Sequence, residues 1–178
     1  MNTRICLLAL TAAFAGGGCG GVLNPPKPKP IAYYTLPGGG DDGVSGAGFD
    51  IDGIANDSGA GPRMRYTSVS GEVIQDEYRR WADSPEQMVA NILRSDFQGG
   101  AARLRANLFC WEIRPVEQKV RMGIEWNWQS GDSRRAVYAA DTADRTPEAF
   151  AAAFRQCVAQ WEKELAAEAA AMEENNEK

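Results

Sequence analysis

A stretch in the second half of the chain constrains the fold most strongly, because apolar and polar residues alternate along it without a break. The apolar positions are Val120, Met122, Ile124, Trp126 and Trp128. Every residue between them, from Lys119 to Gln129, is polar or glycine. Successive side chains of a strand point to opposite faces of a sheet, so this pattern predicts a strand with one buried face. Strands buried on one face only are typical of antiparallel sheets.

Neighbouring segments extend this strand into a sheet. Before it, Ala102 to Cys110 also alternates, with Cys110 on the same side as Leu104 and Leu108, and after it Arg135 to Ala140 predicts the third strand of a meander. Four earlier segments read as strands, with a turn at Ser70-Gly71 joining the last two into a hairpin. They are Ile31 to Leu36, Phe49 to Gly53, Arg63 to Thr67 and Val73 to Tyr78.

Two segments show the 3.6-residue period of amphipathic helices. The first opens at Ser84-Pro85 and ends before Gly99-Gly100, and the second opens at Thr146-Pro147. Beyond Leu165 the apolar stripe is lost while good helix formers continue, so residues 166–178 are expected to form a solvated, acidic helical tail. The stripes are Met88, Val89, Ile92 and Leu93 in the first helix, and Phe150, Phe154, Cys157, Val158, Trp161 and Leu165 in the second.

One fold class accommodates all these faces. The buried sides of the strands and the stripes of both helices need a common core. We therefore predict a single α/β domain over residues 31–165, with a mixed, mostly antiparallel sheet packed with two main helices. Trp81, Trp126, Trp128 and Trp161 are expected to belong to this core rather than to a ligand site.

The first residues of the chain read as an export signal. Arg4 supplies a positive start, Ile5 to Ala15 is an apolar run, and three glycines lead into Cys19. The run is shorter than the roughly 20 residues that a membrane-spanning helix needs, so cleavage is expected. Beyond Cys19, residues 19–30 form a spacer whose prolines favour an extended polyproline II tether.

Two cleavage sites remain open. Ala13-Phe14-Ala15 fits an ordinary signal peptidase, which would release a chain with a free Cys19. The alternative is a lipoprotein signal over residues 1–18, after which Cys19 becomes the N-terminus and carries acyl chains such as palmitate. Gly16 stands where lipoprotein signals usually have leucine. The spacer and the cysteine count favour the lipoprotein, with Cys19 as the lipidation site.

The cysteine count also raises the question of a disulfide. Cys6 leaves with the signal and acylation occupies Cys19, which leaves Cys110 and Cys157 as an even pair in an oxidising compartment. A helix packed on the strand face of Cys110 would bring the two thiols together and close a bridge. The alternative is two separately buried free thiols, because a shift of a few residues along either element would exceed the bridging distance.

Composition excludes several kinds of function. The chain has a net charge of −5 and a pI near 4.9, which argues against nucleic-acid binding. It contains no histidine, so histidine-based catalysis and the commonest zinc ligand are both missing. The aspartates between Asp41 and Asp57 do not have calcium-loop spacing, and no phosphate-binding glycine motif occurs. We expect no metal, no cofactor and no catalytic residue.

The segment from Arg63 to Phe97, RMRYTSVSGEVIQDEYRRWADSPEQMVANILRSDF, resembles the auxiliary lipoprotein component of ABC-type transporters. The matching features are an arginine before Tyr66, a returning strand that leads to Trp81, and the helix from Pro85 that ends in Ile92-Leu93. The lipidated cysteine, the proline-rich spacer and the Tyr34-Thr35-Leu36 strand also fit this family. The resemblance implies a non-enzymatic lipoprotein that works with MCE-domain proteins in moving lipids or other hydrophobic molecules across the periplasm.

Three functions therefore compete. The resemblance favours an accessory lipoprotein on the outer membrane, facing the periplasm, that docks an MCE-domain protein. Gly20 after Cys19, instead of the aspartate that retains lipoproteins on the inner membrane, favours the same location. An envelope scaffold unrelated to transport is the alternative, and a carboxylate enzyme is the third. Either the glycine-rich region around residues 38–61 or the polar side of the Lys119 to Gln129 strand could dock a partner or a second copy.

Overall fold

The structure of the protein, a computed structural model, describes residues 27–38, 48–97, 99–129, 131 and 133–176. The signal segment, Cys19, most of the tether, the centre of the glycine-rich region and residues 177–178 lie outside this range. The expectations for them, including lipidation of Cys19, remain predictions.

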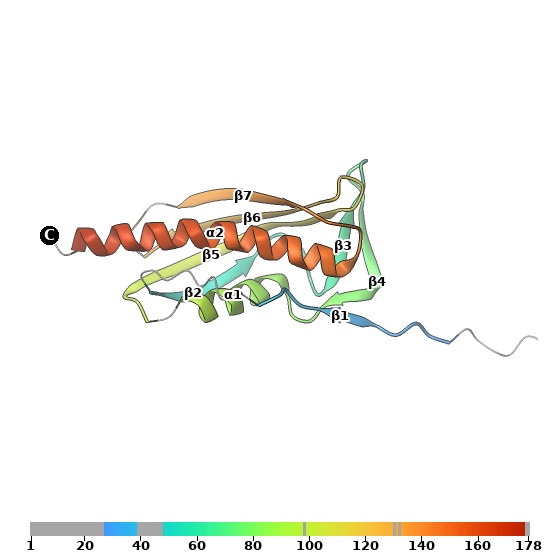
Figure 1. Ribbon diagram of the computed structural model, residues 1–178, viewed down its shortest axis with the longest axis horizontal. Helices are drawn as coiled ribbons and strands as arrows, with labels where there is room; N and C mark the ends of the chain where they lie inside the picture. The colour runs from blue at the N-terminus through green and yellow to red at the C-terminus, as the bar shows by residue number, and fades with distance from the viewer. Residues whose placement is uncertain (1–26, 39–47, 98, 130, 132, 177–178) are drawn as a thin grey trace, which may run out of the picture.

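Seven strands form one mixed sheet, and the alternating segments of the sequence supply all of them (Figure 1). The order is β1-β4-β3-β5-β6-β7, and β2 pairs with β5 beside this path. The strands are β1 Ala32–Tyr34, β2 Phe49–Asn56, β3 Arg63–Thr67, β4 Val73–Trp81, β5 Ala102–Arg114, β6 Lys119–Trp128 and β7 Arg134–Asp141.

The meander of β5, β6 and β7 is antiparallel, as the one-sided alternation predicted. β3 and β4 form the predicted hairpin, whose turn contains Gly71 at a φ of 84°. The parallel pairs are β1 with β4, β2 with β5, and a single bridge between β3 and β5. β2 and β3 thus lie one after the other along the same edge of the long strand β5.

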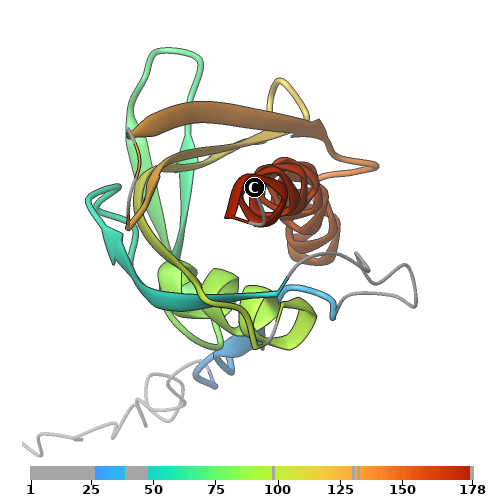
Figure 2. The ribbon, with the colours of Figure 1, turned by 90° about the vertical axis from the view of Figure 1, so that its left-hand side faces the viewer.

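The sheet curves around one helix. Figure 2 looks along α2, Pro147–Asn176, and shows the strands wrapped around it. α2 packs against β6 and β7, while α1, Pro85–Asp96, packs against β2. The predicted α/β architecture, with a mostly antiparallel sheet and two main helices, is confirmed. We call the side of the sheet that faces α2 the inner face and the opposite side the outer face.

Aromatic side chains fill the space between α2 and the sheet. Phe154 of α2 stacks on Trp111 of β5 with ring centroids 3.7 Å apart, and Trp81 meets both rings edge-on. Further along the helix, Trp161 meets Trp126 of β6. All five of these residues are buried, so the predicted core role of the tryptophans is confirmed.

The C-terminal part of α2 is helical, as predicted, but the expectation that it is simply solvated is wrong. Ala169 is buried one turn beyond Leu165. Glu168 accepts hydrogen bonds from the indole N–H groups of Trp126 and Trp128, at 3.2 and 2.6 Å. Its second oxygen accepts one from Arg134. The polar indole N–H groups find their partner only in this helical extension, which therefore belongs to the core.

A buried ionic cluster joins the two helices. The guanidinium of Arg155 on α2 lies 2.8 Å from a carboxylate oxygen of Glu162 on the same helix. It also lies 3.3 Å from a carboxylate oxygen of Asp96, the last residue of α1. The side chain of Glu162 is 2% exposed. Burial raises the pKa of Glu162, and the hydrogen bond from Arg155 partly offsets this rise. Arg155 therefore partly compensates the burial of the Glu162 carboxylate and ties α1 to α2.

Truncation of Trp126 tests the packing of the sheet against α2. Trp126→Ala removes a side chain that is 3% exposed and leaves a cavity, so we expect a loss of about 3–5 kcal/mol in the free energy of unfolding. Chemical denaturation monitored by circular dichroism measures it. Val137→Ala, at a valine 47% exposed on β7, is the control and should change stability by less than about 0.5 kcal/mol. Equal stability of Trp126→Ala and the parent would contradict this packing.

Removal of Arg155 is expected to make stability depend more steeply on pH. Because the pKa of Glu162 is raised by folding, the native state holds this proton to higher pH than the unfolded chain. Stability from this group therefore falls as pH rises from the unfolded pKa through the folded one. Arg155→Met would raise the folded-state pKa of Glu162 further and so widen the pH range between the two pKa values. We therefore expect a loss of about 3–5 kcal/mol in the free energy of unfolding near neutral pH.

The loss from Arg155→Met should shrink towards pH values near the ordinary glutamate pKa of about 4.3, where Glu162 becomes protonated in both states. Denaturation curves over a pH series measure this. Lys163→Met, at an exposed neighbour on α2, is the control and should leave the profile unchanged. A loss that does not vary with pH would mean that Glu162 is already neutral in the parent.

Candidate docking face

The outer face of β5, β6 and β7 carries the largest set of paired charges among the described residues. The alternation that points Val120, Met122 and Ile124 towards α2 points Lys119, Arg121 and Glu125 away from it. The neighbouring strands contribute further side chains to this face. They include Arg103, Arg105, Asn107, Glu112 and Arg114 from β5, and Arg135 and Asp141 from β7.

A β-bulge divides β5 into two parts. Leu108 pairs with Ile124 and Cys110 pairs with Gly123, which leaves Phe109 without a partner on β6. Phe109 lies across Gly123, where a Cβ would come within 2.5 Å of its ring. Arg135 covers the other side of the ring at 3.9 Å. Glycine at position 123 is therefore required by the close approach of the bulged residue.

The bulge changes which residues of β5 face the core. Before it Leu104, Ala106 and Leu108 are buried, whereas after it the buried residues are Trp111 and Ile113. An extra residue in one strand shifts the alternation by one position. Cys110 consequently joins the outer face, although unbroken alternation predicted it on the face of Leu104 and Leu108.

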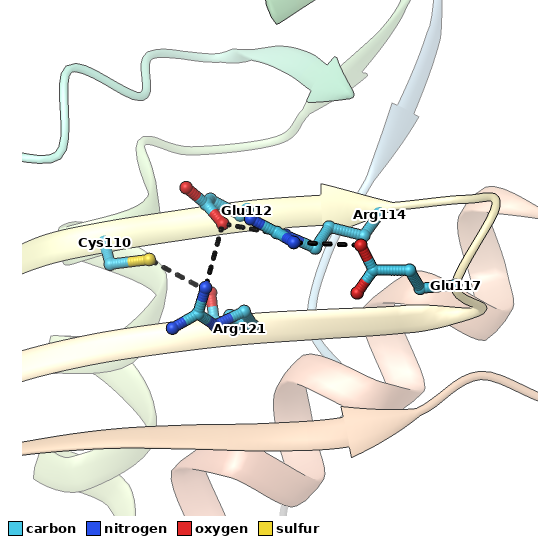
Figure 3. A network of polar contacts seen from close by, with 5 residues as sticks. All are labelled: Cys110, Glu112, Arg114, Glu117 and Arg121. Atoms are coloured by element: carbon cyan, nitrogen blue, oxygen red, sulfur yellow. Dashed lines mark hydrogen bonds and ion pairs between the residues drawn. The ribbon is translucent and has the colours of Figure 1, made fainter. Parts of the chain in front are cut away.

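A polar network lies on the outer face near the β5–β6 turn (Figure 3). Glu112 accepts a hydrogen bond from Arg114 at 3.2 Å and lies 3.8 Å from the guanidinium of Arg121. Arg114 also pairs with Glu117 at 2.9 Å. The Cys110 thiol lies 3.9 Å from the carbonyl oxygen of Arg121. These charged side chains are between a quarter and a half exposed, so they are held by each other and remain accessible to a partner.

A second ionic group lies at the other end of the outer face. Asp52 of β2 contacts Arg103 at 3.1 Å and Arg105 at 3.2 Å, and the hydrogen bond from Arg103 is the main reason that the pKa of Asp52 is lowered. Two adjoining polar hollows share Arg105 and Asn127. The sequence placed Asp52 among solvated acidic residues, because its arginine partners are about fifty positions away and only the parallel pairing of β2 with β5 brings them together.

The predicted Cys110–Cys157 disulfide is not formed, and both thiols are free. Cys157 is fully buried on α2, at the inner face, whereas the bulge turns Cys110 to the outer face. The sheet itself therefore separates the two cysteines. The alternative of two separate thiols describes the structure.

Neither thiol is activated for chemistry. Burial, with a smaller contribution from Glu112, raises the pKa of Cys110, and burial raises the pKa of Cys157 to about 12. A thiol with a raised pKa is protonated at neutral pH and is a poor nucleophile. Within the described residues, no group of three or more cysteine, aspartate or glutamate side chains is arranged to hold a metal ion. The outer face is suited to recognition of another surface through charges and hydrogen bonds.

Of the two docking regions considered from the sequence, the structure describes one in full. The polar side of the Lys119 to Gln129 segment belongs to the outer face of β6. The glycine-rich region is described only in part, and its residues from Phe49 to Asn56 form β2, which contains the predicted strand from Phe49 to Gly53. None of the helices among the described residues is long and apolar enough to cross a membrane.

No family model matches the chain, and no curated protein matches it either. Solved structures do share its fold. One, described as an uncharacterized protein, has a TM-score of 0.60 and 16% identity, with 79% of this chain and 97% of that chain covered. Another is protein XCC0632 from Xanthomonas campestris, described as DUF330, with a TM-score of 0.58, 15% identity and coverage of 83% and 99%. At this identity the similarity establishes a common fold for the whole domain.

The separation of the two cysteines predicts the result of thiol titration. A chain that begins at residue 19 with Cys19→Ser, isolated from the periplasm and denatured without reduction, should show two free thiols. In the folded protein only Cys110 should react, and more slowly than an ordinary cysteine, because its pKa is raised. Cys110→Ser should leave one thiol that reacts only after unfolding. A parent chain with no free thiol before reduction would contradict the separation.

Proposed function

We propose that this protein is a non-enzymatic lipoprotein of the outer membrane that acts as the auxiliary component of an ABC-type transport system with an MCE-domain protein. Acyl chains on Cys19 would hold it on the periplasmic side of the membrane. The MCE-domain partner would dock on the outer face of β5, β6 and β7. The cargo would be a lipid or another hydrophobic molecule.

The observation that carries this proposal is the segment from Arg63 to Phe97. Its sequence resembles the auxiliary lipoprotein family, and in the structure it forms the β3–β4 hairpin followed by α1, with Trp81 and Leu93 buried. The fold shared with a DUF330 protein, which covers 83% of this chain, supports the view that the described residues form one domain of a known type. The predicted signal and tether precede this domain as they would in an anchored lipoprotein.

The outer face supports docking in its own right. Arg103 and Arg105 are 53% and 74% exposed at their side chains although both contact Asp52. Charges that are already paired and oriented lose little side-chain freedom on binding, and complementary charges set the orientation of a partner. Acidic and basic groups are interspersed on this face, which suits a protein surface with matching charges.

An envelope scaffold would have the same anchor and the same kind of face. The scaffold and the transport component differ only in the partner that they bind, so identification of the partner distinguishes the two functions. A catalytic function receives no support from the described residues, because the half-buried thiol has a raised pKa and Asp52 is held ionised by arginine.

Co-purification tests the proposal. The lipidated chain, expressed in a Gram-negative host together with the ATPase, permease and MCE-domain protein of an ABC-type transport system, should fractionate with the outer membrane and retain the MCE-domain protein after cross-linking. The double substitution Arg105→Glu and Arg121→Glu should lower recovery of that protein on the order of tenfold, because like charges would then oppose each other across the interface.

Lys163→Glu, on the exposed side of α2, is the matched control and should leave recovery unchanged. Mass spectrometry of the mature N-terminus should find acylated Cys19. An outer-membrane lipoprotein that retains no MCE-domain protein would instead support the scaffold, whereas an unmodified N-terminus at Gly16 would rule out the anchor.

A further inference from the structure

Large apolar side chains are exposed mainly at one end of the molecule. Six of the eight that are exposed among the described residues lie on β1, on β4 or close to them in the chain, and a seventh is in the β5–β6 turn. The first six are Ile31, Tyr33, Val69, Val73, Ile74 and Tyr78, the seventh is Val116, and the eighth, Val137, lies on β7. Figure 1 shows β1 and the two turns at the same end of the long axis, opposite the C-terminus of α2.

Val69 and Val116 are the most prominent of the turn residues. Val69 is 75% exposed at the tip of the β3–β4 hairpin, and Val116 is 59% exposed in the turn between β5 and β6. Both are apolar points on convex turns. A convex apolar point can enter the deformable boundary of a lipid bilayer, whereas a rigid protein partner would need a matching hollow for each of them.

The same edge is basic although the chain as a whole is acidic. Residues 27–34 and 63–81 contain six basic side chains and three acidic ones, while the whole chain has a net charge of −5. The acidic side chains are Glu72, Asp76 and Glu77, of which Asp76 is bound to Arg79 and Tyr66. Lys29 lies over the ring of exposed Tyr78. Basic side chains next to exposed aromatic and aliphatic ones are typical of surfaces that bind anionic lipids.

The tether also enters the domain at this end. Lys27 to Pro30 lead directly into β1, and Figure 1 shows them at the same end of the long axis as the two turns. β1 pairs with the part of β4 that is farthest from the β3–β4 turn. Lys27 follows Cys19 by eight positions along the chain, a span of at most about 29 Å when fully extended. An acyl group on Cys19 would thus keep this end, rather than the C-terminal end of α2, close to the bilayer.

We infer that this end of the molecule is a membrane-contact surface, in which Val69 and Val116 enter the interfacial region of an anionic bilayer and the basic residues of the tether and of β4 face its head groups. This inference rests on the proposed function only for the anchor that would bring the surface to the membrane. Contact at this end would leave the group of Asp52, Arg103 and Arg105, at the other end of the outer face, free for a protein partner.

Vesicle binding without the anchor tests the surface itself. The chain from residue 19 with Cys19→Ser should co-sediment with vesicles of phosphatidylethanolamine and phosphatidylglycerol, and less with phosphatidylcholine alone. Val69→Asp combined with Val116→Asp should reduce binding at least about tenfold, because burial of a single valine already contributes a factor of that size. Val137→Asp, at a similarly exposed valine on β7, should bind as the parent does.

Lipid quenching locates the contact in the anchored protein. All five native tryptophans are buried, so a new tryptophan on the surface gives a signal that the parent lacks. In vesicles that contain brominated lipids, the lipidated Val69→Trp chain should be quenched and the lipidated Val137→Trp chain should not. Circular dichroism of each variant confirms that it is folded.

Equal vesicle binding by the parent and the double aspartate variant, or equal quenching at positions 69 and 137, would overturn the inference. The inference would also be overturned if the parent chain did not bind vesicles while the double aspartate variant lost its protein partner. Val69 and Val116 would then belong to a protein interface. The vesicle assay lacks the anchor, so its failure leaves the transport proposal intact, whereas failure of Cys19 acylation or of partner recovery leaves the vesicle result intact.

Discussion

The packing of α2 inside the curved sheet is the interaction on which the remaining structure depends. Trp111 and Phe154 lie parallel at 3.7 Å, and they bring the longest strand and the longest helix into direct contact. Large aromatic side chains bury more apolar surface than any others and so dominate the stability of a core. The sheet has to curve to keep contact with α2 from Phe154 to Ala169, and the outer face is turned away from the helix.

The second constraint is the bulge at Phe109. Without it β5 would present Cys110 to the helix, and Trp111 and Ile113 would point to solvent. The bulge thus lets both halves of β5 contribute buried side chains to the core, although the alternation of the second half is shifted by one residue. Gly123 completes this arrangement, since only a residue without a side chain leaves room for the Phe109 ring on the outer face. The same shift moves a thiol from the core to the polar network of Glu112 and Arg121.

Polar groups are used in two different ways in this fold. Glu162 and Glu168 are partly or wholly enclosed and satisfy groups that the core would otherwise leave without partners, the guanidinium of Arg155 and two indole N–H groups. Asp52 and Glu112 hold arginines at the surface, where exposed ion pairs contribute little to stability. The first pair secures the attachment of the helices. The second pair orients arginines on the outer face, where the Asp52 group lies at the end away from the β5–β6 turn.

The sequence alone determined the strands, the two helices and their buried stripes, because alternation and the 3.6-residue period are local properties of the chain. Trp126 and Trp128 could be assigned to the core from their positions in β6 for the same reason. The predicted docking side of β6 also followed from alternation. Tertiary structure decided the parallel pairing of β2 with β5, the burial of α2 beyond Leu165 and the side of the sheet on which Cys110 lies. Each of these depends on residues distant in sequence, and a single extra residue at Phe109 reverses what a local pattern implies for every position after it.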